Sequence, residues 1–115
     1  MHIKVRLGLR DAAGEPFMGI GLVWLLRGVQ RSGSLSAAAR EMGMSYSKAH
    51  GLVRKLEAAL GCGVLARERG GSGRGGSSLT PRGLRFLERF EALDASVKKQ
   101  AEAIFRRSFP GGELA

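Results

Sequence analysis

Residues 34–60 read SLSAAAREMGMSYSKAHGLVRKLEAAL, and this stretch decides the fold. Its first part predicts a short helix over residues 35–42, capped by Ser34, because a serine hydroxyl accepts a hydrogen bond from the first helical turn. Gly43 can adopt the left-handed backbone conformation that a tight turn needs. A second helix follows over residues 46–60. Two helices joined by a glycine turn are the layout of a helix-turn-helix, whose second helix enters the DNA major groove.

The second predicted helix has an inner and an outer face. Apolar side chains at helical spacing form the inner face: Ala49, Leu52, Val53, Leu56 and Leu60. Reading of base edges requires hydrogen-bonding side chains at the exposed start of such a helix. The candidate DNA-contacting residues here, with Ser45 as the N-cap, are Ser45, Tyr46, Ser47, Lys48, His50, Arg54 and Lys55. For Tyr46, contact with a sugar or a thymine methyl and coverage of the inter-helix turn stay open as alternatives.

Gly51 interrupts the outer face of this helix. A glycine inside a helix costs about 1 kcal/mol relative to alanine. Two explanations are open. The glycine lets the helix backbone come close to a base or a phosphate, or makes room for a side chain of a partner; alternatively, it is a neutral residue on a solvent-exposed face.

A glycine-rich hairpin follows the second helix. The residues Gly61 and Gly63 flank Cys62 and end the helix, and residues 64–69 and 78–79 are predicted strands. The connection over residues 70–77 contains five glycines and predicts a flexible loop, or wing, along a phosphate strand or in the minor groove. Its candidate DNA contacts are Arg67, Arg69 and Arg74. A linker loop without contacts is the alternative, and a phosphate-binding P-loop fits poorly because its Gly-Lys-Ser/Thr end is missing.

A long helix is predicted from the N-cap Thr80 and the helix-starting Pro81 to about residue 109, where Pro110 stops it. Phe86, Phe90, Leu93, Val97 and Ile104 lie on one stripe, close to the seam of a coiled coil. So long a helix exceeds what a small domain can cover, so we expect it to form a homodimer. Trp24, on the broadly apolar first helix, is added to the expected dimer interface.

The N-terminal region is predicted to hold one strand and one helix. Residues 2–10 alternate apolar and polar side chains, which is typical of a strand with one buried face. Its expected partner lies near residues 63–80. Pro16 fits the first turn of a helix over residues 16–32, which Gly33 ends.

These elements predict a mainly α fold with a small β-sheet: a winged helix-turn-helix plus a long C-terminal dimerisation helix. The 115 residues divide into residues 1–82 as the DNA-binding domain with its N-terminal strand, residues 83–109 as the dimerisation helix, and residues 110–115 as a tail.

The charge of the chain favours a polyanionic partner. The net charge is +9 and the pI about 11.1. Residues 45–82 contain seven basic and two acidic side chains, so the positive charge is concentrated at the motif. The longest apolar runs are far shorter than a membrane span, and residues 1–10 lack the apolar block of a signal peptide. We expect a cytoplasmic protein.

Neither a metal site nor catalysis is expected from this sequence. Cys62 is the lone cysteine, and His2 and His50 are far apart. No pairing of a base with a nucleophile is visible, so we expect no catalytic residues, no metal ligands and no cofactor.

From about residue 15 to residue 95 the chain resembles the N-terminal winged helix-turn-helix domain of ModE-type regulators, which respond to molybdate and are related to LysR-type regulators. The residues that carry the resemblance are Gly33-Ser34-Leu35-Ser36, Ala38-Ala39, Met44-Ser45-Tyr46, Ala49, Leu65-Ala66-Arg67, the glycines from 70 to 76, and Leu79-Thr80-Pro81-Arg82-Gly83.

The resemblance implies a homodimer that places one recognition helix of each subunit in successive major grooves. Two departures stand out. The family pattern commonly has tryptophan at the position of His50 and an acidic residue at that of Gly51, so the base preference is expected to differ. Full-length relatives also carry a C-terminal molybdate-binding region. If the chain is complete at Ala115, two alternatives are open: molybdate regulation does not extend to this chain, or the effector is sensed by a separate protein.

The leading hypothesis is therefore a homodimeric, sequence-specific regulator of transcription that binds double-stranded DNA. The resemblance implies in addition a link to molybdate or another metal oxyanion. A protein-interaction or dimerisation module with an incidental basic surface is the alternative. A nucleotide-using enzyme is disfavoured by the missing catalytic groups.

Overall fold

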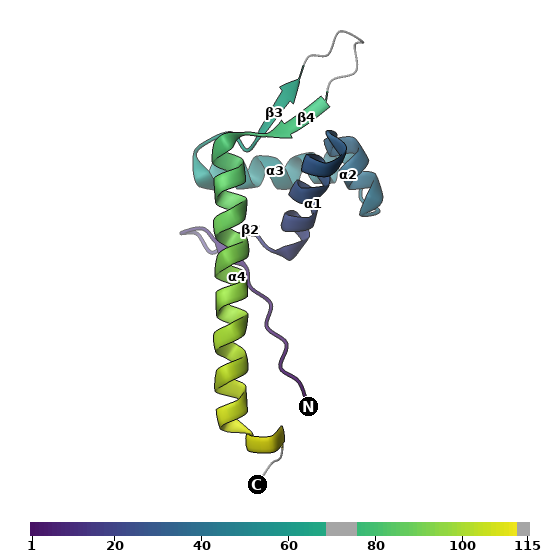
Figure 1. Ribbon diagram of the computed structural model, residues 1–115. Coiled ribbons are helices and arrows are strands. Elements are labelled where there is room, and N and C mark those ends of the chain that lie inside the picture. The colour runs from purple at the N-terminus through teal and green to yellow at the C-terminus, as the bar shows by residue number, and fades with distance from the viewer. Residues whose placement is uncertain (69–75, 113–115) are drawn as a thin grey trace.

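The computed structural model describes residues 1–68 and 76–112. Three helices form the head of the molecule: α1 (Ile20–Ser32), α2 (Leu35–Glu41) and α3 (Tyr46–Leu60). A two-stranded wing and a long helix, α4, extend from the head in different directions (Figure 1). The predicted fold class, a mainly α winged helix-turn-helix with small β-structure, is confirmed.

Serine caps define the starts of the two helices of the helix-turn-helix, as predicted. The Ser34 hydroxyl accepts a hydrogen bond from the Ala37 amide at 3.0 Å, and the Ser45 hydroxyl accepts one from the Lys48 amide at 3.1 Å. Gly43 has a φ of 69°, the left-handed conformation expected between α2 and α3. The predicted starts of α2 and α3 are therefore confirmed.

The core of the head depends on a close approach of α1 and α2. A Cβ atom placed on Gly28 would lie 2.9 Å from the Cβ of Ala38, which is too close for a side chain. Small residues at this crossing let Leu25, Leu26 and Val29 of α1 become fully buried. Packing at the density of a protein interior thus sets the positions of α2 and α3.

The wing consists of β3 (Leu65–Glu68) and β4 (Gly76–Leu79), paired antiparallel with Leu65 opposite Leu79. Both strands predicted around the glycine-rich connection are present, but β4 begins at Gly76, two residues earlier than expected, so Gly76 and Ser77 belong to the strand and not to the loop. Arg69 and Arg74, two of the predicted DNA contacts, lie outside the described residues.

Helix α4 (Pro81–Ser108) contains 28 residues, which corresponds to a length of about 42 Å. The Thr80 hydroxyl caps it by accepting a hydrogen bond from the Gly83 amide at 3.0 Å. Near its start the helix packs tightly on the head, since a Cβ on Gly83 would lie 2.6 Å from the carbonyl oxygen of Val64. Beyond Phe90 it projects from the head to a short 3-10 turn, η1 (Pro110–Gly112) (Figure 1).

An ion pair joins α1 to α4. The Arg27 guanidinium donates from Nε to Glu91 Oε2 at 3.3 Å and from Nη2 to the other carboxylate oxygen. This hydrogen bonding to Glu91 raises the pKa of Arg27. The guanidinium, charged at any physiological pH, therefore holds the two helices together on a partly exposed surface.

Two predictions for the N-terminal region were wrong. The strand β1 is only Leu9–Arg10, and it pairs with β2 (Pro16–Met18) instead of with the wing. Helix α1 consequently begins at Ile20, four residues later than Pro16 suggested. The reason is a tight turn in which the Asp11 carboxylate accepts hydrogen bonds from the amides of Ala13 and Glu15, both at 2.9 Å. A partner six or nine residues away along the chain costs far less loop-closure entropy than the wing would.

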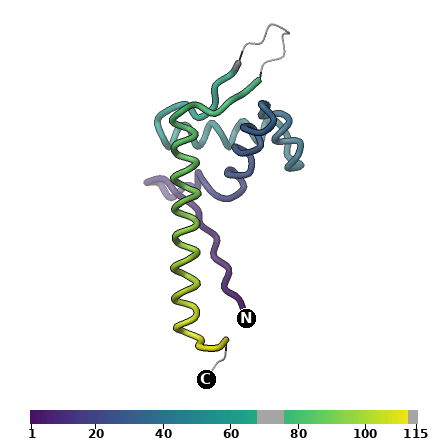
Figure 2. Tube along the Cα trace, in the orientation of Figure 1, coloured from purple at the N-terminus to yellow at the C-terminus, as the bar shows by residue number. Residues whose placement is uncertain are grey.

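Residues 1–8 continue from β1 as an extended segment that runs beside α4 (Figure 2). Ile3 and Val5 line a shallow cavity together with Lys98 and Glu102 of α4, and both apolar side chains are half-buried there. The predicted alternation of apolar and polar residues is real. Its apolar side, however, faces a helix instead of a sheet.

Candidate nucleic-acid interface

Helix α3 presents small side chains on the face turned away from the core. Ala49, Val53 and Leu56 are buried against the head. Successive residues of a helix are rotated by about 100°, so Ser47 and Gly51 lie on the opposite side. Both are exposed, and a Cβ on Gly51 would meet no atom within 4 Å. The backbone of α3 is therefore accessible to a large partner along this face.

One flank of α3 faces the wing and brings three predicted DNA contacts together. The Tyr46 hydroxyl accepts a hydrogen bond from Arg67 Nη2 of β3 at 2.9 Å. The Tyr46 ring also stacks on His50, with ring centroids 5.8 Å apart and planes at 20°. We call Tyr46, His50 and Arg67, together with the exposed Arg54, the wing flank. Tyr46 thus binds Arg67 of the wing, a role that neither alternative from the sequence included.

A cavity of about 290 Å³ separates α3 from the wing at this flank. Side chains of the wing flank line it, as do Glu57 of α3 and Ser77 of β4. In the sequence, Tyr46 and Arg67 are 21 residues apart, so no periodic signal links them. The pairing depends on where β3 begins relative to the end of α3.

The base of the wing is tied to the helices by backbone hydrogen bonds. One Glu57 carboxylate oxygen accepts from the amides of Val64 and Leu65, at 2.7 and 3.3 Å. On the other strand, the Ser77 amide donates to the carbonyl of Gly33 at 2.8 Å. These contacts hold β3 and β4 in fixed positions beside α3, so Arg67 is presented from a rigid base.

The opposite flank of α3 faces the β1–β2 hairpin. Lys48 and Lys55 stand on this side, at the edge of an apolar groove of about 410 Å³ that includes Phe17, Leu22 and Leu52. Lys55 Nζ lies 3.6 Å from the Glu15 carboxylate of the hairpin. Both partners are exposed, so this ion pair contributes little stability and is open to exchange for another anion.

The start of α3 adds backbone donors to this surface. The Ser45 hydroxyl is engaged as the cap, while Ser47 and Lys48 are exposed in the first turn. No acidic residue stands in that turn. The free amides of a helix start carry partial positive charge, which suits a phosphate oxygen.

The residues predicted for a dimer interface fall into two groups. Trp24, Leu93 and Ile104 are 61%, 44% and 52% exposed, and Phe86 and Val97 are half-buried. Phe90 is 2% exposed and belongs to the core of its own chain. The structure therefore does not offer Phe90 as a surface residue, although the sequence placed it on the same stripe.

Other kinds of site find little support in the described ranges, residues 1–68 and 76–112. They contain no cluster of three or more His, Cys, Asp or Glu side chains suited to a metal ion. No helix within them is long and apolar enough to cross a membrane.

Comparison with known proteins agrees with the site. The family described as bacterial regulatory helix-turn-helix protein, lysR family, matches residues 23–84. The molybdenum-pterin-binding protein MopB of Rhodobacter capsulatus is 40% identical over 82 residues, which cover 71% of this chain and 30% of MopB.

Two solved structures are similar as well. The CbnR_DBD–DNA complex has a TM-score of 0.56 at 28% identity, covering 77% of this chain and 100% of that one. Full-length CbnR complexed with its target DNA has a TM-score of 0.58 at 25% identity, covering 77% of this chain and 29% of that one. The chain thus spans less than a third of MopB and of full-length CbnR.

Proposed function

The chain belongs to the lysR family of bacterial regulatory helix-turn-helix proteins, and on this premise we propose that it is a transcription regulator that binds a specific double-stranded DNA sequence as a homodimer. The observation that carries the proposal is the exposed face of α3 at Ser47 and Gly51, with basic side chains on both of its flanks. A surface of this shape suits the major groove, which is about 12 Å wide.

In the proposed complex, α3 lies in the major groove and the wing follows one phosphate strand. Arg54 and His50 supply donors and acceptors toward base edges at the wing flank. Arg67 supplies a positive charge toward a phosphate, oriented by its hydrogen bond to the Tyr46 hydroxyl. Gly51 allows the helix to approach without a side chain at the centre of the contact.

Homodimerisation is supported by the exposed apolar side chains of α1 and α4. Trp24, Leu93 and Ile104 are large and about half exposed or more, which is costly for a helix that stays alone in water. A two-fold dimer would place two copies of α3 on half-sites one helical turn apart.

The test of sequence-specific binding starts with recovery of duplexes of about 30 base pairs from a random pool, long enough for two such half-sites. A palindromic consensus is expected. Affinity for the selected duplex should fall steeply with salt, because basic side chains displace counterions from phosphates. The absence of measurable duplex affinity at low salt would sink the proposal and favour the protein-interaction alternative.

Two variants separate base contacts from phosphate contacts. Arg54→Ala should reduce affinity for the selected duplex by about 1–3 kcal/mol more than for a scrambled one. Arg67→Ala should weaken both duplexes alike and lower the salt slope by about 1. Arg106→Ala, far along α4, is the matched control and should change neither quantity. Equal losses on both duplexes for Arg54→Ala would reassign Arg54 to phosphate.

The role of the Tyr46 hydroxyl is tested by a double-mutant cycle. Tyr46→Phe keeps the ring and its stacking on His50 but removes the acceptor for Arg67. Its effect on affinity should vanish in the Arg67→Ala background. Additive losses would show that Tyr46 contacts DNA independently of Arg67.

A link to molybdenum is a further part of the proposal. It is supported by the 40% identity to MopB, which is described as a molybdenum-pterin-binding protein. We expect genes beside the selected sites to change expression between molybdate-starved and molybdate-replete cells. The signal would be sensed by another region or by a separate protein. Unchanged expression would remove the link while leaving DNA binding intact.

A further inference from the structure

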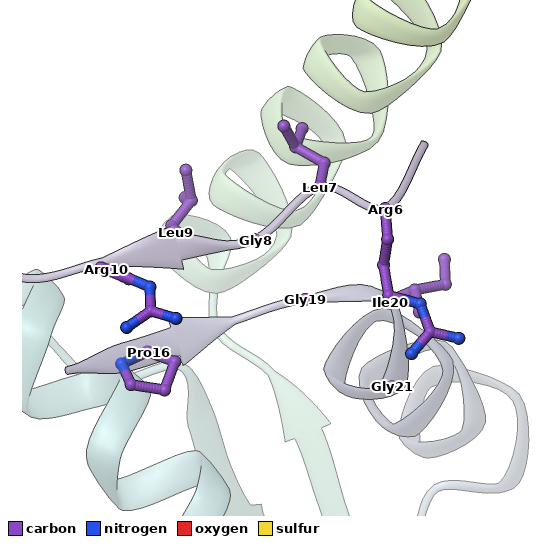
Figure 3. Close-up of a pocket in the computed structure, with 9 residues that line it drawn as sticks. All are labelled: Arg6, Leu7, Gly8, Leu9, Arg10, Pro16, Gly19, Ile20 and Gly21. Atoms are coloured by element: carbon purple, nitrogen blue, oxygen red, sulfur yellow. The ribbon is translucent and has the colours of Figure 1, made fainter. Parts of the chain in front are cut away.

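The β1–β2 hairpin and the extended segment before it lie outside the matched family region, which begins at residue 23, and they carry basic residues that the proposed function does not yet use. Arg6 and Arg10 extend from one side of the N-terminal segment, toward β2 and the start of α1, while Leu7 and Leu9 point away from that side (Figure 3). Alternate residues of an extended chain point to the same side, so both guanidinium groups serve one surface.

A cavity of about 530 Å³ lies between Arg6 and Arg10. Three of its lining residues, labelled in Figure 3, are Gly8, Gly19 and Gly21, which have no side chains to narrow the cavity. Arg10 Nη1 donates to the carbonyl of Gly14 at 2.9 Å, which holds that guanidinium near the hairpin turn.

This cavity adjoins the groove beside α3. Both are lined by Pro16, Gly19 and Gly21, and the lining of the groove includes Lys48 and Lys55. We call the exposed basic side chains of Arg6, Arg10, Lys48 and Lys55 the hairpin flank.

The acidic groups at this surface are already engaged. Glu15 pairs with Lys55 at 3.6 Å. One carboxylate oxygen of Asp11 accepts two backbone hydrogen bonds within the turn. The hairpin flank therefore keeps a net positive charge, because four basic side chains outnumber the two carboxylates of Asp11 and Glu15.

We propose that the hairpin flank contacts the phosphate strand of DNA opposite to the strand that the wing contacts. This inference rests on the proposed function. A helix in the major groove lies between two phosphate strands, so each of its flanks faces one of them. The wing flank faces one strand through Arg67. The hairpin flank lies on the other side of α3 and is also positively charged, which suits the negative phosphates of the second strand.

The experiment compares salt slopes for the selected duplex. The double variant Arg6→Gln/Arg10→Gln removes two phosphate contacts, and each contact contributes about 0.9 to the slope of log affinity against log salt. The slope should fall by about 1.8. Raising the salt from 50 to 200 mM should therefore reduce the affinity of the variant by a factor about ten times smaller than the factor for the parent. The preference for the selected duplex over a scrambled one should stay unchanged.

The control is Arg106→Gln/Arg107→Gln, which removes the same charge from exposed positions in the last turn of α4. Circular dichroism checks that both double variants fold. If the hairpin variant and the control share the parent slope, the inference is overturned while the proposed function stands. A reduced preference for the selected duplex would also overturn it, because it would indicate base contacts. If the parent binds no duplex, the proposed function itself fails.

Discussion

The two parts of α4 carry the same apolar stripe but meet different surroundings. In the proximal part, Pro81 to Phe90, the side chains of Leu87 and Phe90 are buried in the head. In the distal part, from Glu91 onward, Leu93 and Ile104 are 44% and 52% exposed. Periodicity identifies the apolar side of a helix, and only the tertiary structure shows what covers it. The proximal part therefore belongs to the fold, and the distal part is available for association.

The largest expected effect is at Phe90. Phe90→Ala should destabilise the chain by about 3–5 kcal/mol, because it removes a buried aromatic ring and leaves a cavity. Thermal or urea unfolding measures the change. A loss below about 1 kcal/mol would place Phe90 outside the core and erase the difference between the two parts of α4.

Gly83 is the next position in order of effect. A Cβ at this site would lie 2.6 Å from a backbone oxygen of Val64, so Gly83→Ala should destabilise the chain by about 1–3 kcal/mol. Gly51→Ala is the matched control on an exposed helix, where no atom lies within 4 Å, and it should stabilise by up to about 1 kcal/mol. Equal effects of the two substitutions would contradict the tight seat of α4 on the head.

A smaller effect is expected at the boundary between the two parts. Glu91→Gln removes the charge that pairs with Arg27. Because both side chains are about one-third exposed, the cost should be roughly 0.5–1 kcal/mol, and it should shrink at high salt. A cost independent of salt, read from urea unfolding, would mean that packing instead of charge holds α1 to α4.

The smallest effect on the free energy of unfolding is expected in the distal part of α4. A substitution there should nevertheless abolish dimer formation. Leu93→Asp should change the unfolding free energy of the isolated chain little, since its side chain is already 44% exposed. It should nevertheless produce monomers in light scattering, because a buried charge at a dimer seam is costly. Ala95→Asp, exposed on the opposite side of α4, is the control. A dimer that survives Leu93→Asp would place the interface elsewhere.

The features that could be predicted from the sequence are those with local chemistry. Ser34, Ser45 and Thr80 cap helices through contacts with residues three positions away, and Gly43 acts within one turn. Such signals survive in any tertiary context, which explains why α2, α3 and the start of α4 were located correctly. The end of α3 has the same origin, since Gly61 caps the helix in the left-handed conformation, with a φ of 71°.

The features that the sequence did not predict correctly depend on tertiary contacts between distant parts of the chain or on residues that suit more than one structure. Proline at position 16 suits both a helix start and the first residue of a strand. The hydrogen bonds of Asp11 stabilise the turn that brings Pro16 beside Arg10, and Pro16 therefore begins a strand. The contact between Tyr46 and Arg67 joins two elements whose relative position follows from Glu57 and the base of the wing. Phe90 was misplaced because a stripe does not show where the head ends.

The part of α4 that leaves the head, from Glu91 to Ser108, contains 18 residues and is about 27 Å long. A tilt of about 10° at its base would move its far end by about 5 Å, which exceeds the rise of one base pair. In the proposed dimer, a small change in the angle of this segment would therefore be enough to alter the distance between the two α3 helices, without any change in the residues that touch DNA.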